Sequence, residues 1–98
     1  VQFAPDSRLL STRDQSTITS YASVFARRLA ANPRARLMLL GLAEAAEPQA
    51  AALAVARLIA VRQQLEAQGI KSDRIRSGSR VIGTAGAHRR VEAEIAVP

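Results

Sequence analysis

The chain has 98 residues, of which 48% are apolar and 22% charged, a composition that suits one folded domain and excludes a disordered chain. It contains no cysteine, which excludes disulfides and thiol catalysis within these residues. The net charge is +6, and such a balance is compatible with nucleic acid, anionic lipid or an acidic polymer. Because the arginines are scattered along the chain, a solvated basic surface is the preferred interpretation.

We expect a single domain over residues 1–98 that belongs to a longer protein, because the chain begins at Val1 with no signal-like segment. The longest apolar run, residues 50–61, is interrupted only by Arg57. A membrane span needs about 20 apolar residues, so this run predicts a buried helix. Any membrane anchor is then expected outside this chain.

In the first half of the chain, residues 1–3 predict a short strand, and Thr12 with Gln15 fits a capping box for a helix over residues 13–31. Its inner face is predicted from helical spacing: Ile18, Tyr21, Ala22, Phe25 and Leu29. Pro33 ends this helix, since the residue before a proline is driven out of the helical region. Residues 36–40 then predict a buried strand, and residues 41–48 a loop.

In the second half, Pro48 suits the first turn of a helix that continues to about residue 68. Gly69 is predicted as its left-handed C-cap, with Ile70 making the apolar contact that follows. The expected inner stripe of this helix is Ala54, Leu58, Val61 and Leu65. Two strands are expected next, over residues 74–80 and 89–97, joined by a glycine-containing loop over residues 81–87. Alternation in the last strand places Val91, Ala93 and Ile95 opposite Glu92 and Glu94.

Motifs for catalysis, metals and cofactors are not found in the sequence. A lone His88 without cysteines cannot assemble a zinc site, and the glycines do not form a phosphate loop. Glu44 and Glu47 are close in sequence, but carboxylates before a helix favourably meet its macrodipole, so we prefer that interpretation to acid–base catalysis. The three aromatic residues are expected in the core: Phe3, Tyr21 and Phe25. Only the charge then supports nucleic-acid binding, and no nucleic-acid partner is predicted.

Four segments in this order resemble one known family: VQF at the start, LAANPRARLMLLG, LAVARLIAVRQQLEAQGI and HRRVEAEI. They resemble the OmpA-like domain, the C-terminal peptidoglycan-binding module of outer-membrane protein A, Pal lipoproteins and flagellar stator proteins. The resemblance implies an α+β fold of order β-α-β-α-β-β, with two helices packed on one face of a small mixed sheet. It also implies a non-enzymatic domain in the periplasm.

The binding motif of that family is altered in this sequence. The family's G-H-T-D is replaced by Gly41-Leu42-Ala43-Glu44, and the following loop is about two residues shorter. In the family, the Asp of this motif and an Arg on the next helix hold a diaminopimelate residue of the wall peptide. Carried over by position, Arg57 would grip the ligand carboxylate, Glu44 or Glu47 would replace the Asp, and Gly41, Leu42 and Ala43 would offer backbone groups.

Two functional hypotheses follow from this resemblance. In the first, the domain anchors an envelope complex at the peptidoglycan through Arg57 and one of the two glutamates. In the second, the pocket is degenerate, and the domain is a protein–protein scaffold in a secretion system or outer-membrane complex. Arg57 then has a structural role. Either the aliphatic part of its side chain packs on apolar neighbours while the guanidinium reaches water, or the guanidinium pairs with Glu44 or Glu47 across the loop.

Overall fold

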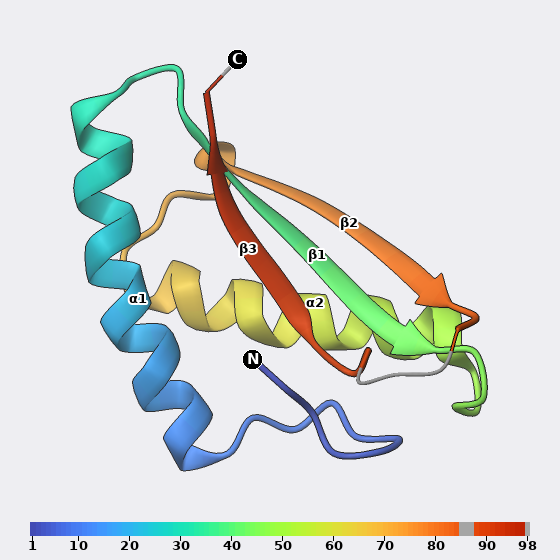
Figure 1. Ribbon diagram of the computed structural model, residues 1–98. Coiled ribbons are helices and arrows are strands. Elements are labelled where there is room, and N and C mark those ends of the chain that lie inside the picture. Colours follow the sequence, from blue (N-terminus) through green and yellow to red (C-terminus); the bar gives the residue numbers. More distant parts are fainter. Residues whose placement is uncertain (85–87, 98) are drawn as a thin grey trace.

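The computed structural model describes residues 1–84 and 88–97 and contains two long helices and a three-stranded sheet (Figure 1). In chain order the elements are α1 (Thr12–Ala31), β1 (Arg36–Glu44), α2 (Ala50–Ala67), the 3₁₀ turn η1 (Ser72–Arg74), β2 (Ile75–Ile82) and β3 (Val91–Ala96). Residues 85–87 of the expected loop 81–87 lie outside the described residues.

Helix α1 begins one residue earlier than the sequence predicts. Its N-cap is Ser11, whose hydroxyl accepts from the Asp14 backbone N–H at 3.0 Å, while the Asp14 carboxylate accepts from the Ser11 N–H at 3.2 Å. The predicted box of Thr12 and Gln15 was therefore wrong by one position, because two candidate caps stand side by side in the sequence. The helix ends at Ala31, with Asn32 as its C-cap directly before Pro33, as predicted.

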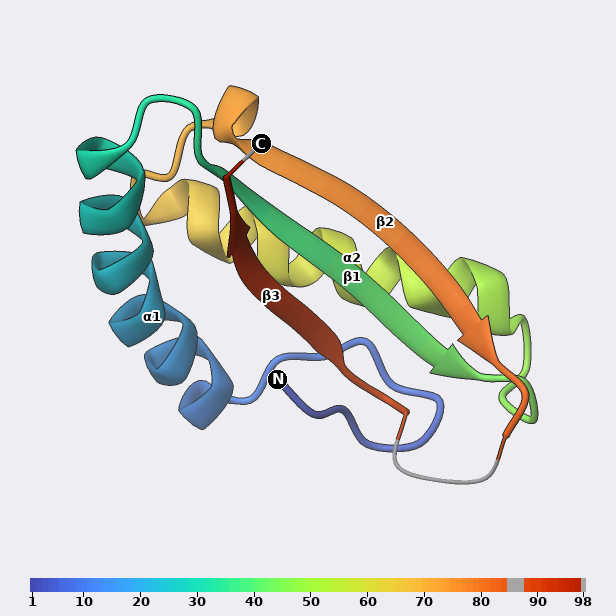
Figure 2. The same ribbon diagram turned by 45° about the horizontal axis from the view of Figure 1, so that its top comes forward.

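Fewer residues of α1 are buried than its apolar pattern predicts. Ile18, Ala22 and Leu29 are buried, but Tyr21 is 57% exposed and stacks on half-buried Phe25, with ring centroids 5.9 Å apart. The prediction of a core Tyr21 was wrong. The physical reason is visible in Figures 1 and 2: α1 lies beside the sheet rather than flat across it, so only part of its circumference is covered.

The sheet has the order β2-β1-β3, with β2 parallel and β3 antiparallel to the central β1. Strand β1 continues to Glu44 and β2 to Ile82, because residues 41–44 pair in register with residues 79–82. The predicted loop 41–48 therefore begins only after Glu44, and loop 81–87 only after Ile82. Alternation in β3 is as predicted, since Val91, Ala93 and Ile95 lie opposite the inward-facing Gly41, Leu39 and Leu37. Of the three, Val91 is buried and Ile95 half-buried, whereas Ala93 is exposed.

The predicted first strand is reduced to one isolated bridge between Gln2 and Arg90, beside the N-terminal side of β3. Backbone bonds join Phe3 N–H to the Arg89 carbonyl at 2.6 Å and Val91 N–H to the Val1 carbonyl at 3.0 Å. The segment therefore pairs with the chain as a strand would, but over too few residues to form one.

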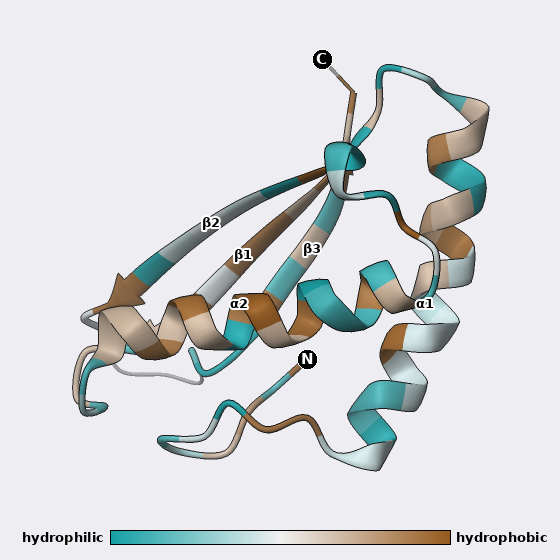
Figure 3. Cartoon of the chain, turned by 180° about the vertical axis from the view of Figure 1, so that it is seen from behind, coloured by the Kyte–Doolittle hydropathy of each residue, from teal (hydrophilic) through white to brown (hydrophobic). Residues whose placement is uncertain are grey.

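Helix α2 is apolar on nearly all sides in its first three turns (Figure 3). It begins at Ala50, two residues after the predicted Pro48, behind a left-handed Gln49 with φ of 51°. Its predicted inner stripe is buried: Ala54, Leu58, Val61 and Leu65. The end is as predicted, because Gly69 has φ of 97° and the Ile70 N–H donates to the Leu65 carbonyl at 3.2 Å.

Both helices lie on one side of the sheet, and the opposite face of the sheet is open (Figures 1 and 3). Helix α2 packs very closely on β1 at Gly41, where a Cβ atom would stand 2.3 Å from the Ala54 carbonyl oxygen and 2.8 Å from the Leu58 Cβ. The predicted α+β architecture, two helices on one face of a small mixed sheet, is therefore confirmed. Within the described residues, neither helix combines the length and hydrophobicity needed to cross a bilayer.

Candidate functional site

The guanidinium of Arg57 lies in the interior of the protein, with a relative exposure of 0% for the residue. Its guanidinium makes five hydrogen bonds, as many as it has N–H donors. Three go to the carbonyls of Ala4, Ser7 and Leu42, at 3.3, 2.8 and 3.1 Å. The expectation of an Arg57 head that reaches water is therefore wrong.

The other two donors of Arg57 grip the carboxylate of Glu47. Nη1 lies 2.9 Å from Oε1 and Nη2 lies 2.5 Å from Oε2, a bidentate pair between side chains that are 0% and 5% exposed. Each oxygen of Glu47 also accepts one backbone N–H: Glu44 donates to Oε1 and Asp6 to Oε2, both at 2.8 Å. Every polar atom of this buried ion pair therefore has a partner within the chain.

The charge state of Glu47 follows from these contacts. The hydrogen bonds from the Arg57 guanidinium lower the pKa of the Glu47 carboxyl from 4.5 to about 2, and burial opposes this shift. The N–H groups of Glu44 and Asp6 lower the pKa further. Glu47 is thus ionised at neutral pH, and the cluster is a closed, neutralised pair.

The ion pair joins segments that are distant in sequence. Residues 3–7 wrap over it, because the Phe3 ring lies under the guanidinium at 5.4 Å from Cζ to the ring centroid, and Ala4 and Ser7 supply carbonyls. The loop after β1 supplies Glu47, and α2 supplies Arg57. The pair therefore fixes the N-terminal loop against α2 and the end of β1.

Two residues beside the cluster have left-handed backbone conformations without being glycine. Asp6 has φ of 58° and Gln49 has φ of 51°. Such residues store strain that surrounding contacts must hold in place. Asp6 lies in a turn that is closed by the Ser7 N–H, which donates to the Ala4 carbonyl at 3.2 Å, and it also donates its own N–H to Glu47.

Glu44 does not take part in the cluster through its side chain. Its carboxylate accepts from the backbone N–H of His88 at 3.1 Å and faces Nη1 of Arg89 at 3.4 Å. Arg89 in turn donates to the Phe3 carbonyl at 3.1 Å. Of the two glutamates proposed from the sequence, the structure brings Glu47 to Arg57 and places Glu44 in a separate, partly exposed pair.

Gly41, Leu42 and Ala43 all lie within β1, where they are buried. The Leu42 carbonyl accepts from Arg57, and the Leu42 N–H donates to the Arg90 carbonyl at 2.8 Å. Of these three residues, Leu42 contacts the cluster through its carbonyl, while Gly41 packs against α2 and Ala43 is paired with Val81 in the sheet.

The carbonyl acceptors at Ala4 and Ser7 were not found by sequence reasoning. Carbonyl groups carry no residue-type signal, and only the proximity of residues 3–7 to α2 reveals them. The sequence signal for Glu47 was only that it is the second carboxylate between the predicted strand and the helix that carries Arg57.

Comparisons with known proteins show relatives by structure only: no family model matches the sequence, and no curated protein matches it. The C-terminal domain of MotB from Helicobacter pylori superposes with a TM-score of 0.83 at 15% identity, over 99% of this chain and 83% of that domain. The peptidoglycan-associated lipoprotein from Burkholderia pseudomallei gives 0.76 at 19% identity, over 98% and 88%. The OmpA-like domain of FopA1 from Francisella tularensis gives 0.76 at 19% identity, over 98% and 70%.

These superpositions cover almost the whole chain, so they concern its entire architecture and not one supersecondary motif. They agree with the resemblance read from the four sequence segments, which lie on β1, α2, β3 and the N-terminal bridge. The fold of this chain is that of the OmpA-like domains.

Proposed function

We propose that this chain is a non-enzymatic OmpA-like domain of the bacterial cell envelope, in the periplasm, where it is a scaffold for other envelope proteins. The envelope location is supported by proteins of the same fold, among them a periplasmic domain of MotB and a peptidoglycan-associated lipoprotein. The scaffold role is supported by one observation: Arg57 is 0% exposed and has all its donors engaged inside the chain.

A closed Arg57 disfavours capture of a wall peptide at this position. A ligand carboxylate would have to displace the Glu47 carboxylate, which holds two bonds from Arg57 and two from backbone N–H groups. Displacement would leave a buried glutamate without its partner, which costs about 3–5 kcal/mol of free energy. Glu47 therefore takes the role that the ligand carboxylate would have in an open pocket.

Co-sedimentation with purified sacculi tests this proposal, with the lipoprotein from Burkholderia pseudomallei as the positive control. We expect the wild-type chain to stay in the supernatant under conditions in which the lipoprotein pellets. Pelleting of the wild type that is lost in Arg57→Met, with the variant still folded by circular dichroism, would contradict the closed site.

Wall binding through Arg57 is the second candidate, and the strained loop favours it. Asp6 and Gln49, both left-handed, flank the cluster, and backbone strain of this kind gathers at sites whose segments move, as residues 4–7 and Glu47 would have to do together. Such a movement would expose Arg57 to a ligand carboxylate. Protection of the Asp6 amide from hydrogen exchange distinguishes the two: it should persist with stem peptide present if the site stays closed.

For the larger assembly that contains this chain, we propose a class and not a particular complex. A secretion system or an outer-membrane complex fits an envelope scaffold, and membrane attachment would come through segments outside this chain. Retention on DNA at physiological salt would contradict this proposal, since binding through scattered charge alone falls steeply as salt rises.

A further inference from the structure

One side of the sheet ends at β2, which pairs only with β1 among the described residues. Figures 1 and 2 show no helix or strand beside its outer edge. The strand is regular, because its register with β1 continues from Ile75 to Ile82 without a bulge, and it contains no proline. A regular edge without proline can accept a further strand.

The backbone groups on this outer edge belong to every second residue of β2. The Ile82 carbonyl accepts from the Ala45 N–H at 2.9 Å, just after β1, so the backbone groups of Ile82 point toward β1. Alternate residues of a strand point their N–H and C=O groups to opposite sides. The groups that point outward are therefore those of Ser77, Ser79 and Val81, and we name them the outer edge of β2.

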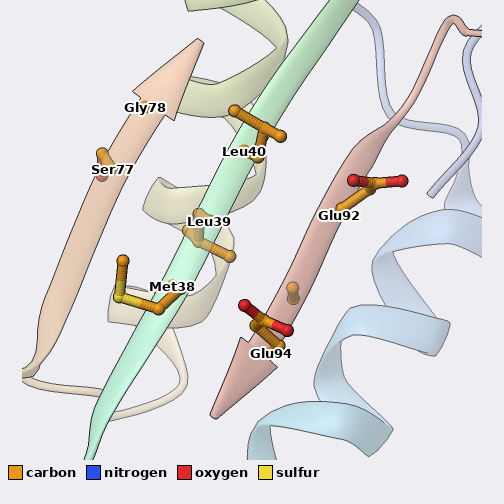
Figure 4. Close-up of a pocket in the computed structure, with 8 residues that line it drawn as sticks. Met38, Leu39, Leu40, Ser77, Gly78, Glu92 and Glu94 are labelled. Carbon is orange, nitrogen blue, oxygen red and sulfur yellow. The ribbon is translucent and has the colours of Figure 1, made fainter. Parts of the chain in front are cut away.

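On the open face of the sheet, the outer edge is flanked by positive charge. Arg76 and Arg80 are exposed, and within the described residues neither makes an ion pair or a hydrogen bond. The acidic residues of this face, Glu92 and Glu94, lie on β3, on the far side of β1 (Figure 4). Two strand spacings, about 10 Å, separate the two charged strands, so the arginines have no carboxylate beside them.

On the helix side, the same edge is flanked by exposed apolar residues. Arg62 of α2 donates to the Ser77 hydroxyl at 2.5 Å, which places the Arg62 flank of the helix under β2. Val55 and Ile59 share that flank by helical spacing, and they are 41% and 46% exposed. Val81, which faces the helix side of the sheet as Ser77 does, is 38% exposed. An added strand would cover these apolar groups with every second side chain.

From these two sides we infer that the outer edge of β2 binds an extended segment of another envelope protein, in which apolar and acidic residues alternate. The inference names a partner class for the scaffold role proposed above, and it rests on that role. The segment adds to the sheet as a further strand through backbone hydrogen bonds. Its acidic side chains lie beside Arg76 and Arg80, and its apolar side chains lie over Val55, Ile59 and Val81.

The charge of the edge favours this partner over a second copy of the chain. Antiparallel pairing of β2 with β2 of another copy keeps both open faces on the same side of the joined sheet. Arg76 and Arg80 of both copies then gather on that side, and like charges on neighbouring strands are destabilising. Charged residues at an edge prevent pairing of this kind, whereas an acidic strand is attracted to them.

Fluorescence anisotropy with a labelled synthetic peptide tests the proposal, and the probe alternates valine and glutamate over about seven residues. We expect it to bind, and we expect no binding of a peptide that alternates valine and lysine. Reversing both charges, Arg76→Glu with Arg80→Glu, should weaken binding of the glutamate peptide about tenfold or more and make the lysine peptide the better ligand. The matched control is Arg27→Glu with Arg28→Glu, an equal change in charge on the exposed side of α1, and it should bind like the wild type.

Amide hydrogen exchange shows whether the peptide binds as a strand. With the glutamate peptide present, the amides of Ser77, Ser79 and Val81 should become protected, because only those point outward. Ser79→Pro removes one of them without removing a bond to β1, so it should abolish binding, while Ser79→Ala should retain it. If Ser79→Pro does not fold, a peptide N-methylated on the nitrogens that face β2 tests the same bonds and should not bind.

Three results would each overturn the proposal. They are a glutamate peptide that does not bind at millimolar concentration, an equal loss of binding in the α1 control, and binding without protection of the outward amides. The co-sedimentation with sacculi is a separate readout, because it does not involve the edge of β2. Pelleting of the wild type through Arg57 would contradict the closed site, and it would leave the peptide measurements to be judged on their own.

Discussion

Arg57 and Arg74 each hold distant segments together at opposite ends of β1, yet among the residues that the structure describes only Arg57 of these two has a carboxylate partner. Arg74 is half-buried and donates to the carbonyls of Leu29, Asn32 and Ala35, at 2.8, 2.8 and 3.0 Å from Nη2. Those carbonyls lie at or just beyond the C-terminus of α1, where the helix dipole is negative. A cation with access to water is satisfied by this partial charge, whereas the fully buried Arg57 needs the whole charge of Glu47.

Glu47→Gln should lower the free energy of unfolding more than any change at Arg74, because it removes the charge that Arg57 needs. The amide cannot neutralise Arg57, and its NH₂ group meets other donors where the carboxylate accepted four N–H bonds. Leaving the guanidinium buried without its counter-charge should lower the free energy of unfolding by about 3–5 kcal/mol. Urea unfolding followed by far-ultraviolet circular dichroism measures this in a chain without tryptophan.

A double variant serves as the control for this prediction. Arg57→Met alone should cost a similar amount, since it leaves Glu47 buried and unpaired. The two changes combined should cost at least about 2 kcal/mol less than the sum of the single effects, because the pair acts as a unit. Additive effects would mean that the two side chains do not depend on each other.

Acid should lower the free energy of unfolding within a defined pH range, through protonation of Glu47. The pKa of Glu47 is about 2 in the folded chain, against an ordinary value of 4.5 that applies once the chain unfolds. The stabilisation from Glu47 is therefore complete above about pH 5 and is lost as the pH falls from 4.5 toward 2. This shift corresponds to about 3 kcal/mol. The difference in unfolding free energy between the wild type and Glu47→Gln should shrink across that window; a constant difference would contradict the lowered pKa.

Arg74→Ala should have a smaller effect than any change at Glu47. It removes hydrogen bonds from a half-buried guanidinium to neutral carbonyls, so the expected loss is about 1–2 kcal/mol. It leaves no buried charge behind. Its loss should also be independent of pH between 5 and 2, in contrast with the Glu47 contribution; urea titrations at the two pH values make that comparison.

Local patterns predicted the elements whose ends are marked in the sequence. Gly69 ended α2 as expected, and alternation in β3 gave the correct face for Val91 and Ile95, although Ala93 on that face is exposed. Strand β1 was predicted too short because its last four residues are held by pairing with β2, a long-range contact that no local pattern contains. The burial of Tyr21 was predicted wrongly for a similar reason. Helical spacing identifies an apolar face, but it does not show how much of that face a neighbouring element covers.

The ion pair of Arg57 was predicted in part, while a ligand-binding role for these residues stays a prediction. Arg57 stood out because a cation in an apolar helix demands a partner, and both nearby glutamates were named. Choosing between them required the path of the loop after β1, which brings Glu47 and not Glu44 under the guanidinium. The closing segment, residues 3–7, contributes backbone groups whose role follows only from the tertiary structure.

Of the changes considered, Glu44→Gln should lower the free energy of unfolding least, and it compares the two glutamates directly. Glu44 and Glu47 are three residues apart, but the Glu44 carboxylate is 22% exposed and its contact with Arg89 is 3.4 Å. An exposed pair of this kind contributes about 0–1 kcal/mol, and the amide oxygen of Gln still accepts from the His88 N–H. We expect a loss below about 1 kcal/mol in the same urea titration, falling further in high salt. A loss as large as that of Glu47→Gln would mean that burial does not separate the two glutamates, and that Glu44 also belongs to the charge balance of Arg57.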